Sequence, residues 1–146
     1  MHLAVQQIHQ RSVHPGPLVL RTAPIKFPPP APDTDFMVRL CDVDEAGRSV
    51  KLADGILAAR FRNGFSAPEY LEPGKVEKLV IRTSKISHCF LPGHRLRVSV
   101  TSGAKHFVFP NSNTKDAYNS TESRVAHNTV WHGGAAPSHI LLHVER

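Results

Sequence analysis

Hydrophobic residues recur at every second position in several short segments of this chain, and this spacing limits its fold more than any other feature. The clearest example is the segment 95–100, where Leu96, Val98 and Val100 alternate with Arg and Ser. Successive side chains of a β-strand point to opposite faces of a sheet, so this spacing predicts a strand with one buried face. No stretch longer than about seven residues keeps the 3.6-residue period of a helix, and none has convincing helix caps.

The same alternation returns along the chain between clusters of turn-forming residues. We expect further strands at 36–41, around Val50 and Leu52, and at 56–61, 76–81, 86–90, 124–131 and 138–144. Turns are predicted at 42–48, 63–64, 72–74 and 92–93, which contain the Gly, Asn, Asp and Pro residues that tight turns favour. The 12 prolines outnumber the 9 glycines, which indicates many loops and sheet edges. Roughly eight to ten short strands separated by turns are typical of an all-β sandwich, either immunoglobulin-like or jelly roll.

The first 30 residues differ from the rest of the chain. They end in Phe27-Pro28-Pro29-Pro30, whose prolines have no amide hydrogen to donate and hold the backbone extended. Residues 15–20 contain one short candidate strand. We therefore predict an N-terminal extension or degenerate edge strand with a Pro-rich linker at 1–30, followed by one β-sandwich domain at 31–146. A chain of 146 residues is long enough to form a single core.

The formal net charge of +6 is a usual sequence signal for a nucleic acid or another anionic partner. The cations are scattered singly, however, without a run of about five and with few aromatic residues between them, so we expect no nucleic-acid partner. The chain has no signal-peptide pattern and no stretch of about 18 apolar residues. We therefore expect no membrane partner and a cytoplasmic location, with Cys41 and Cys89 reduced.

A long loop is predicted at 101–118. This segment is rich in Asn, Ser and Lys and contains Phe107 and Phe109. Polar residues with turn preferences favour a surface loop over a packed strand. We expect the two phenylalanines to anchor this loop on the sandwich.

Candidate catalytic motifs are weak throughout the chain. A serine nucleophile on a sharp elbow needs Gly-x-Ser-x-Gly, and the nearest segment is Gly64-Phe65-Ser66-Ala67-Pro68, where proline replaces the last glycine. His132-Gly133-Gly134 is similar to the oxyanion loop of lipases, but it lies between the last two predicted strands and is better explained as a turn. We predict no catalytic residue.

The 10 histidines suggest a zinc site as one hypothesis. His139 and His143 project from one face of the last predicted strand, and His127 lies on the strand before it. No His-x-His or Glu-x-x-His pattern fixes a ligand geometry. If that face points inward, we expect His139 to be a core polar residue bonded to backbone.

The acidic residues suggest calcium as a second metal hypothesis, because calcium binds clustered oxygens. Asp33, Asp35, Asp42 and Asp44 bracket a strand and do not follow the order of an EF-hand loop. We expect Asp33, and also Asp54 before Gly55, to cap turns through bonds to backbone. We predict no bound metal and no cofactor.

Four motifs in fixed order resemble the C-terminal domain of the cocaine esterase and X-Pro dipeptidyl peptidase (CocE/NonD) family of serine hydrolases. They are Ala31-Pro32-Asp33-Thr34-Asp35-Phe36, Leu52-Ala53-Asp54-Gly55-Ile56-Leu57, Gly93-His94-Arg95-Leu96-Arg97 and Pro137-Ser138-His139-Ile140-Leu141-Leu142. The resemblance extends over 31–144 and implies a jelly-roll β-sandwich of the galactose-binding-domain-like type. The family domain begins with further strand-forming residues, which a polar stretch replaces at 1–14, so an N-terminal edge strand is in doubt.

The resemblance implies a non-catalytic accessory domain. In this family the catalytic Ser, Asp and His lie in a separate α/β-hydrolase domain, so dipeptidyl-peptidase or esterase activity comes to this chain by family association alone. The implied partner is such a domain in trans, or a second copy paired through an open sheet edge. The candidate interface or motif positions are Asp33, Asp35, Asp54, His94, Arg95, Asn111, Asn113, His127 and His139.

Three other interpretations stay open, and whether the chain is an enzyme stays open with them. A small-ligand or carbohydrate-binding module would need an exposed aromatic platform near the 101–118 loop. A catalytic site would need Ser66, Ser87 or Ser138 beside a histidine and an acid. The chain would also fit the remnant of a truncated hydrolase gene, because its N-terminus departs from the family pattern.

Overall fold

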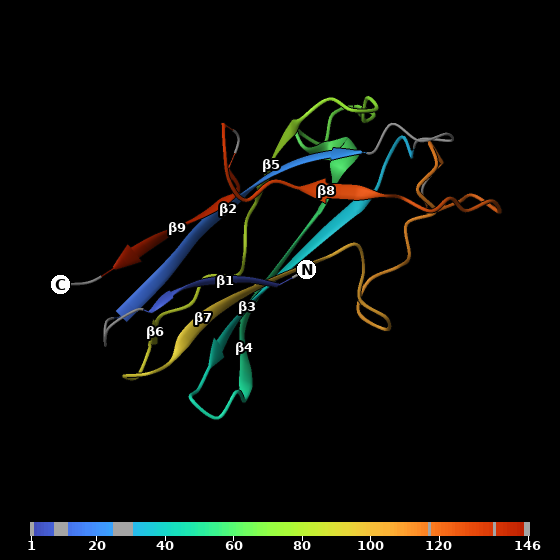
Figure 1. Cartoon of the computed structure of the whole chain (residues 1–146). Coiled ribbons are helices and arrows are strands. Elements are labelled where there is room, and N and C mark those ends of the chain that lie inside the picture. Colours follow the sequence, from blue (N-terminus) through green and yellow to red (C-terminus); the bar gives the residue numbers. More distant parts are fainter. Residues whose placement is uncertain (1, 8–11, 25–30, 117, 136, 145–146) are drawn as a thin grey trace.

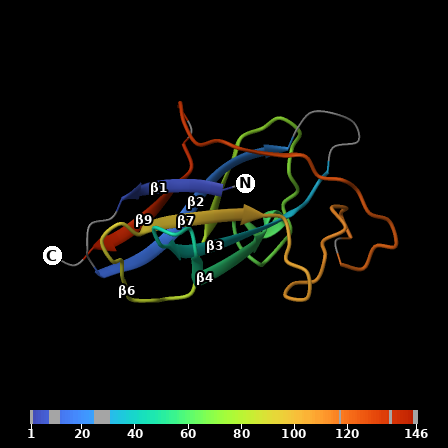
Figure 2. The ribbon, with the colours of Figure 1, turned by 60° about the horizontal axis from the view of Figure 1, so that its bottom comes forward.

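The chain forms two packed antiparallel β-sheets, as a computed structural model shows (Figure 1). The structure describes residues 2–7, 12–24, 31–116, 118–135 and 137–144. Sheet A has the strand order β1 (His2–Gln7), β7 (Arg95–Thr101), β3 (Asp35–Val43) and β4 (Ser49–Ala58), which lie side by side in Figure 2. Sheet B contains β2 (Ser12–Pro24), β5 (Glu77–Ile81), β6 (His88–Cys89), β8 (Asn128–Val130) and β9 (His139–Val144). A short 3₁₀ helix, η1 (Ala59–Phe61), follows β4.

Strand β2 is the central strand of sheet B. It pairs with β5 along 18–22, with β6 along 12–13, with β9 between 13 and 19, and with β8 along 22–24. A strand residue bonds one neighbour on each side, so β5 and β6 lie along one edge of β2, and β8 and β9 lie along the other. Sheet B therefore depends on a segment near the N-terminus.

The hydrophobic core lies between the two sheets. Leu96, Val98 and Val100 of β7 point into it, as their alternation predicts. Each apolar side chain that leaves water contributes roughly 1.5–3 kcal/mol to folding. The other buried members are Leu18, Phe36, Val38, Leu40, Ala53, Ala59, Leu71, Leu79, Ile81 and Phe90.

Strand β3 is buried on both faces, although only one of them belongs to the core. Met37, Cys41 and Val43 point away from the core and are nevertheless only 3%, 6% and 2% exposed. Arg97 lies opposite Cys41, and Arg95 lies opposite Val43 on the neighbouring strand. The aliphatic stem of an arginine can cover apolar surface while its guanidinium stays in water. Cover of this kind accounts for the low exposure of the outward-pointing apolar side chains of β3.

Strand β4 runs unbroken through a position where a turn is predicted. A Cβ on Gly55 would lie 2.5 Å from the carbonyl oxygen of Arg82, which follows β5. The backbone N–H of Ser84 donates to the carbonyl of Asp54 at 3.0 Å. Gly55 therefore permits a close approach between β4 and the end of β5, and the predicted turn cap by Asp54 is wrong.

The predicted all-β sandwich is confirmed, and so are the turns at 42–48, 63–64, 72–74 and 92–93. The last two predicted strands are present as the shorter β8 and as β9. Among the described residues, no helix is long and apolar enough to cross a lipid bilayer.

The N-terminal segment differs from its prediction. Residues 2–7 form β1 on the edge of β7, so the edge strand that the sequence leaves in doubt is present. Residues 12–24 form the long central strand β2, where only one short candidate strand at 15–20 is predicted, within an extension or degenerate edge strand. Backbone pairing, on one side for β1 and on both sides for β2, holds these strands, although their sequence lacks regular alternation. The proline run at 28–30 lies outside the described residues.

Candidate functional site

The segment 102–127, between β7 and β8, leaves the sheets at one end of the sandwich (Figure 1). It contains the predicted loop at 101–118 and extends beyond it. His106 and Asn113 take positive φ angles of 66° and 60°, a region that Asn and His enter more readily than most residues. Polar side chains of this segment meet polar side chains from the sandwich at its base.

Arg60 and Asp33 form a buried ion pair at this base, with side chains 10% and 0% exposed. Asp33 Oδ1 accepts a hydrogen bond from the backbone N–H of Arg60 at 2.9 Å, and its Oδ2 accepts one from Nε at 2.8 Å. The two other guanidinium nitrogens donate to the carbonyl oxygens of Lys115 at 2.9 Å and Thr114 at 2.8 Å. Burial of a charge pair is tolerated when the remaining donors are satisfied, and here the backbone of the 102–127 segment satisfies them.

Asn111 links a second carboxyl group to this pair. Its Nδ2 donates to Asp33 Oδ2 and to Asp35 Oδ1, both at 2.7 Å, and the Tyr118 hydroxyl donates to Asp35 Oδ2 at 3.0 Å. Burial raises the pKa of Asp35 above its ordinary 3.8, and the opposing hydrogen bonds from Asn111 and Tyr118 do not cancel this effect. Burial, followed by the charge of Asp35, raises the pKa of Tyr118 to about 12.

We name Asp33, Asp35, Arg60, Asn111 and Tyr118 the polar hub. Its members bond to one another and to backbone, and they join β3, η1 and the 102–127 segment. Their hydrogen-bonding groups are therefore engaged within the fold. The hub therefore holds the 102–127 segment on the sandwich.

Asn113 extends the hub along the segment. Its backbone N–H donates to Asn111 Oδ1 at 2.8 Å, and its Nδ2 donates to the carbonyl of Arg124 at 2.7 Å. The N–H of Arg124 donates in turn to the carbonyl of Ser112 at 2.8 Å. The outgoing and returning halves of the segment are therefore bonded to each other.

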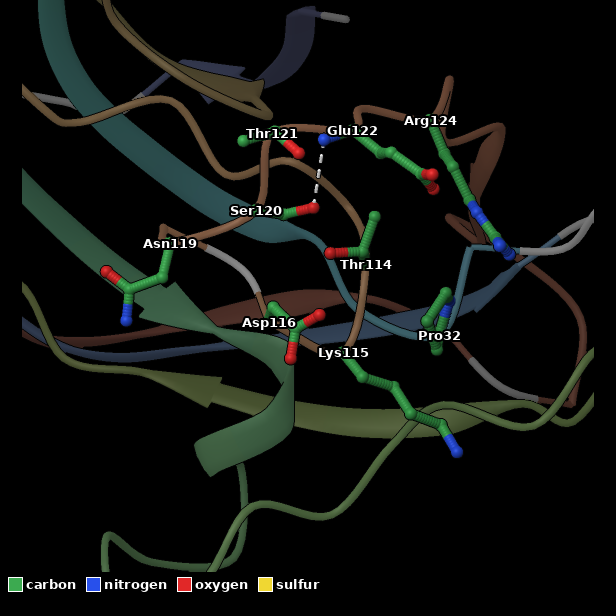
Figure 3. Close-up of a pocket in the computed structure, with 9 residues that line it drawn as sticks. All are labelled: Pro32, Thr114, Lys115, Asp116, Asn119, Ser120, Thr121, Glu122 and Arg124. Atoms are coloured by element: carbon green, nitrogen blue, oxygen red, sulfur yellow. Dashed lines mark hydrogen bonds between the residues drawn. The ribbon is translucent and has the colours of Figure 1, made fainter.

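An open polar cleft of about 600 Å³, drawn in Figure 3, includes Thr114 and Lys115 in its lining. The carbonyl groups of these two residues accept from Arg60, so the cleft adjoins the hub. The Ser120 hydroxyl accepts the N–H of Glu122 at 3.1 Å across one part of the cleft. No aromatic ring is among the described residues that line the cleft, so the stacking platform of a sugar-binding site is missing there. The lining residues are Pro32, Thr114, Lys115, Asp116, Asn119, Ser120, Thr121, Glu122 and Arg124.

A second polar cluster joins β3 to the segment 88–94. One oxygen of Asp42 is hydrogen-bonded to His88 Nε2 at 2.8 Å, and the other is hydrogen-bonded to His94 Nδ1 at 2.9 Å. The predicted motif residue His94 therefore ties the turn at 92–93 to β3. In the described part of the chain, no three His, Cys, Asp or Glu side chains are grouped to hold a metal ion.

Asp54 and Arg95 lie on the outer face of sheet A. Asp54 accepts hydrogen bonds from Arg39 Nε at 2.9 Å and Lys51 Nζ at 3.0 Å. Burial by itself raises the pKa of Asp54, but the bonds from Arg39 and Lys51 outweigh it and hold that pKa below its ordinary 3.8. Arg95 lies opposite Val43 and is exposed.

The last two candidate positions do not join a cluster. His127 is exposed just before β8. On β9, Ile140 and Leu142 pack on the core while His139 is exposed, with Nδ1 at 3.2 Å from the carbonyl oxygen of Pro137. This face of β9 points outward, so His139 is not a core residue.

Two further expectations need correction. Asp33, predicted to cap a turn through bonds to backbone, does accept a backbone N–H, but from Arg60 of the distant η1, and its carboxylate is fully buried in an ion pair with the Arg60 side chain. Phe107 and Phe109, predicted to anchor the loop, are 63% and 85% exposed. Buried hydrogen bonds at the hub, and not these two rings, hold the segment on the sandwich.

Sequence reasoning missed Arg60 and Tyr118. Arg60 falls inside an alternating stretch predicted to be a strand, where a lone arginine is ordinary on a solvent face. The resemblance pointed to Asp33, Asp35 and Asn111, which bond to one another, but gave no sign of Arg60, the cation paired with Asp33. Ser66, the nearest match to a nucleophile, lies exposed in a loop that no helix follows.

Comparison with known proteins supports one assignment of this architecture. The family model described as the X-Pro dipeptidyl-peptidase C-terminal non-catalytic domain matches residues 25–141. Cocaine esterase of Rhodococcus sp. (strain MB1 Bresler) is 37% identical over 115 residues, which are 77% of this chain and 20% of that protein.

Solved structures agree over the whole chain. An aminopeptidase from the marine sediment archaeon Thaumarchaeota archaeon superposes with a TM-score of 0.84 at 25% identity, covering 100% of this chain and 26% of that one. An α-amino acid ester hydrolase superposes with a TM-score of 0.87 at 21% identity, covering 99% and 25%. The chain therefore spans only 20% to 26% of the length of these relatives.

Proposed function

Because the chain belongs to the family of X-Pro dipeptidyl-peptidase C-terminal non-catalytic domains, we propose that it is an accessory domain that binds and stabilises a serine-hydrolase catalytic region. The proposal rests on one observation, the extent of the match. All of this chain superposes on 26% of an aminopeptidase, and the larger part of that enzyme has no counterpart here.

The state of the motif residues supports this role. Inside the hub, Asn111 donates to both Asp33 and Asp35. Asp33 is also paired with Arg60, and His94 bonds to Asp42. Groups that hold a fold together in this way are not free to bind a substrate. A scaffolding role accounts for their presence without any chemistry.

The partner in this proposal is an α/β-hydrolase catalytic region, in trans or in a longer chain. Dipeptidyl-peptidase and esterase activities are then properties of the assembly. A cytoplasmic location belongs to the same proposal, and the free thiols of Cys41 and Cys89 fit a reducing compartment.

The first test is turnover by the purified chain with a chromogenic ester and an X-Pro substrate. We expect no turnover, because the nearest matches to catalytic motifs, Ser66 and the segment 132–134, lie in exposed loops. Turnover that a serine-directed inhibitor abolishes would contradict the proposal, and the labelled serine would then locate a site.

The second test is a chimera in which this chain replaces the matched segment of Rhodococcus cocaine esterase. We expect the chimera to hydrolyse ester and to resist heat inactivation better than the esterase with that segment deleted. Equal inactivation of the chimera and the deleted form would show that this chain does not serve as the accessory domain.

A carbohydrate-binding module remains the second hypothesis. Trp131 is 45% exposed, so a sugar that bound near it would change its fluorescence. The polar cleft beside the hub gives this hypothesis little support, because its described lining has no ring for stacking.

A further inference from the structure

The outer face of sheet A combines an apolar floor with a dense set of cations. Met37, Cys41 and Val43 of β3 form the floor. On one side β7 places Arg97 opposite Cys41 and Arg95 opposite Val43. On the other side β4 places Lys51 opposite Cys41, Asp54 opposite Arg39 and Ile56 opposite Met37. We name this surface the basic face and define it by Arg39, Lys51, Asp54, Ile56, Arg95 and Arg97.

The charges of the basic face do not cancel. Asp54 is bonded to both Arg39 and Lys51, so one carboxylate serves two cations. Arg95 and Arg97 form no ion pair with any residue that the structure describes. The face therefore has a net charge of +3, half of the +6 of the whole chain.

Apolar groups lie among these cations. Ile56 is 47% exposed, and the Phe107 ring, 63% exposed, lies with its centroid 5.8 Å from Lys51 Nζ. Exposed aromatic and aliphatic side chains on the same face as three arginines have the composition of a protein interface, in which Phe and Arg are enriched. A phosphate-binding surface would instead need no exposed apolar centre.

We propose that the basic face is the docking face of this domain and that its partner is a carboxylate-rich surface of the catalytic region, an inference that rests on the proposed function. Carboxylates opposite Arg95 and Arg97 neutralise charges that are unpaired within the described fold. Because arginine binds carboxylates through two parallel hydrogen bonds, these residues also fix the orientation of docking. Ile56 and Phe107 then lose contact with water.

The test uses the cocaine esterase chimera with charge reversals on either sheet. R95E/R97E reverses two charges on the basic face, and K78E/R82E reverses two exposed charges, one in β5 of sheet B and one directly after it. R95K/R97K keeps both the charge and most of the aliphatic stem. Heat inactivation of esterase activity is followed at low salt and in about 1 M NaCl, where exposed charges are screened.

We expect R95E/R97E to inactivate about tenfold faster than the parent chimera at low salt, with a smaller difference at high salt. R95K/R97K and K78E/R82E should resemble the parent. Thermal unfolding of the free chain with R95E/R97E is the control for lost cover over β3, because Glu is shorter than Arg. Since Arg95 and Arg97 make no described ion pair to lose, we expect a loss too small to account for the faster inactivation of the chimera.

Three results would overturn the inference and are distinguishable. If the parent chimera is stable and both reversals behave alike, docking uses another face and the proposed function stands. If the parent chimera is no more stable than the deleted esterase, both the function and the face are wrong. Binding of duplex DNA by the free chain that R95E/R97E abolishes would assign the face to a nucleic acid.

Discussion

The position of the 102–127 segment depends on Arg60, because its guanidinium bonds one carboxylate of the sandwich and two backbone carbonyls of the segment. Removing such a buried partner leaves the other charge without compensation. We expect Arg60→Met to destabilise the chain by about 3–5 kcal/mol in urea unfolding, since the buried carboxyl group of Asp33 would lose its cationic partner.

The matched control is Arg48→Met. Arg48 also pairs with an aspartate, Asp44 at 2.6 Å, but its side chain is 84% exposed. Exposed pairs contribute about 0–1 kcal/mol, so this variant should unfold almost as the parent does. Equal losses in the two variants would show that the hub is not an important source of stability.

Asp35 and Asp54 should give pH dependences of opposite sign. The folded pKa of Asp35 is raised above the ordinary 3.8, so its contribution to stability is full below 3.8 and is lost as pH rises through the folded value. The folded pKa of Asp54 is lowered, so its contribution is present above 3.8 and is lost as pH falls through the folded value.

Asp35→Asn and Asp54→Asn test these signs by denaturant unfolding from about pH 2 to about pH 6. The stability advantage of the parent over Asp35→Asn should shrink as pH rises, whereas its advantage over Asp54→Asn should grow. Parallel curves for the two variants would contradict the assignment of either shift.

Individual residues were only partly predictable from the sequence. The family resemblance singled out Asp33, Asp35 and Asn111 as candidate positions, and these do share one network. Their partner Arg60 comes from η1, which adjoins them through the pairing of β3 with β4, and alternation alone does not reveal such a contact. Phe107 and Phe109 show the converse, because hydrophobicity wrongly predicted burial for two exposed rings.

Among the elements, the packing of β4 against the end of β5 can be tested at Gly55. Gly55→Ala would place a Cβ 2.5 Å from the carbonyl oxygen of Arg82, so backbone must shift. We expect a loss of about 1–3 kcal/mol from this overpacking, measured by thermal or urea unfolding.

Gly103→Ala is the control for this substitution. No atom lies within 4 Å of a Cβ at Gly103, and the position does not require a positive φ. Its stability should stay within about 0.5 kcal/mol of the parent. A neutral Gly55→Ala would indicate that β4 and the end of β5 are less closely packed than described.

Elements with regular alternation were predicted well, and the others were not. β7 and β5 each have one apolar face, and their burial follows it. β2 contains Pro15, Pro17 and Pro24, which argue against a central strand. Its partners on both edges are contributed by segments that follow it in the chain, so local sequence did not reveal its position.

At the scale of the whole molecule, the importance of β2 can be tested by comparing a deletion that removes it with one that keeps it. Removal of residues 1–24 takes away β1 and the strand with which β5, β6, β8 and β9 all pair. We expect this variant to lose cooperative unfolding and amide dispersion in NMR spectra, although residues 25–141 match the family model.

Removal of residues 1–11 is the milder deletion, because it takes away β1 at the edge of sheet A and keeps β2. This variant should stay folded with reduced stability. A well-dispersed spectrum from the larger deletion would mean that sheet B forms without its central strand.

The pairing of β2 with distant strands also determines when sheet B can fold during synthesis. Thr22 of β2 donates to the carbonyl of Thr129, which lies 107 residues further along the chain. A ribosome therefore releases β2 well before its neighbours β8 and β9, so sheet B cannot close until those two strands have emerged. Because distant pairings must wait for long loops to close, we expect folding of sheet B to be slow.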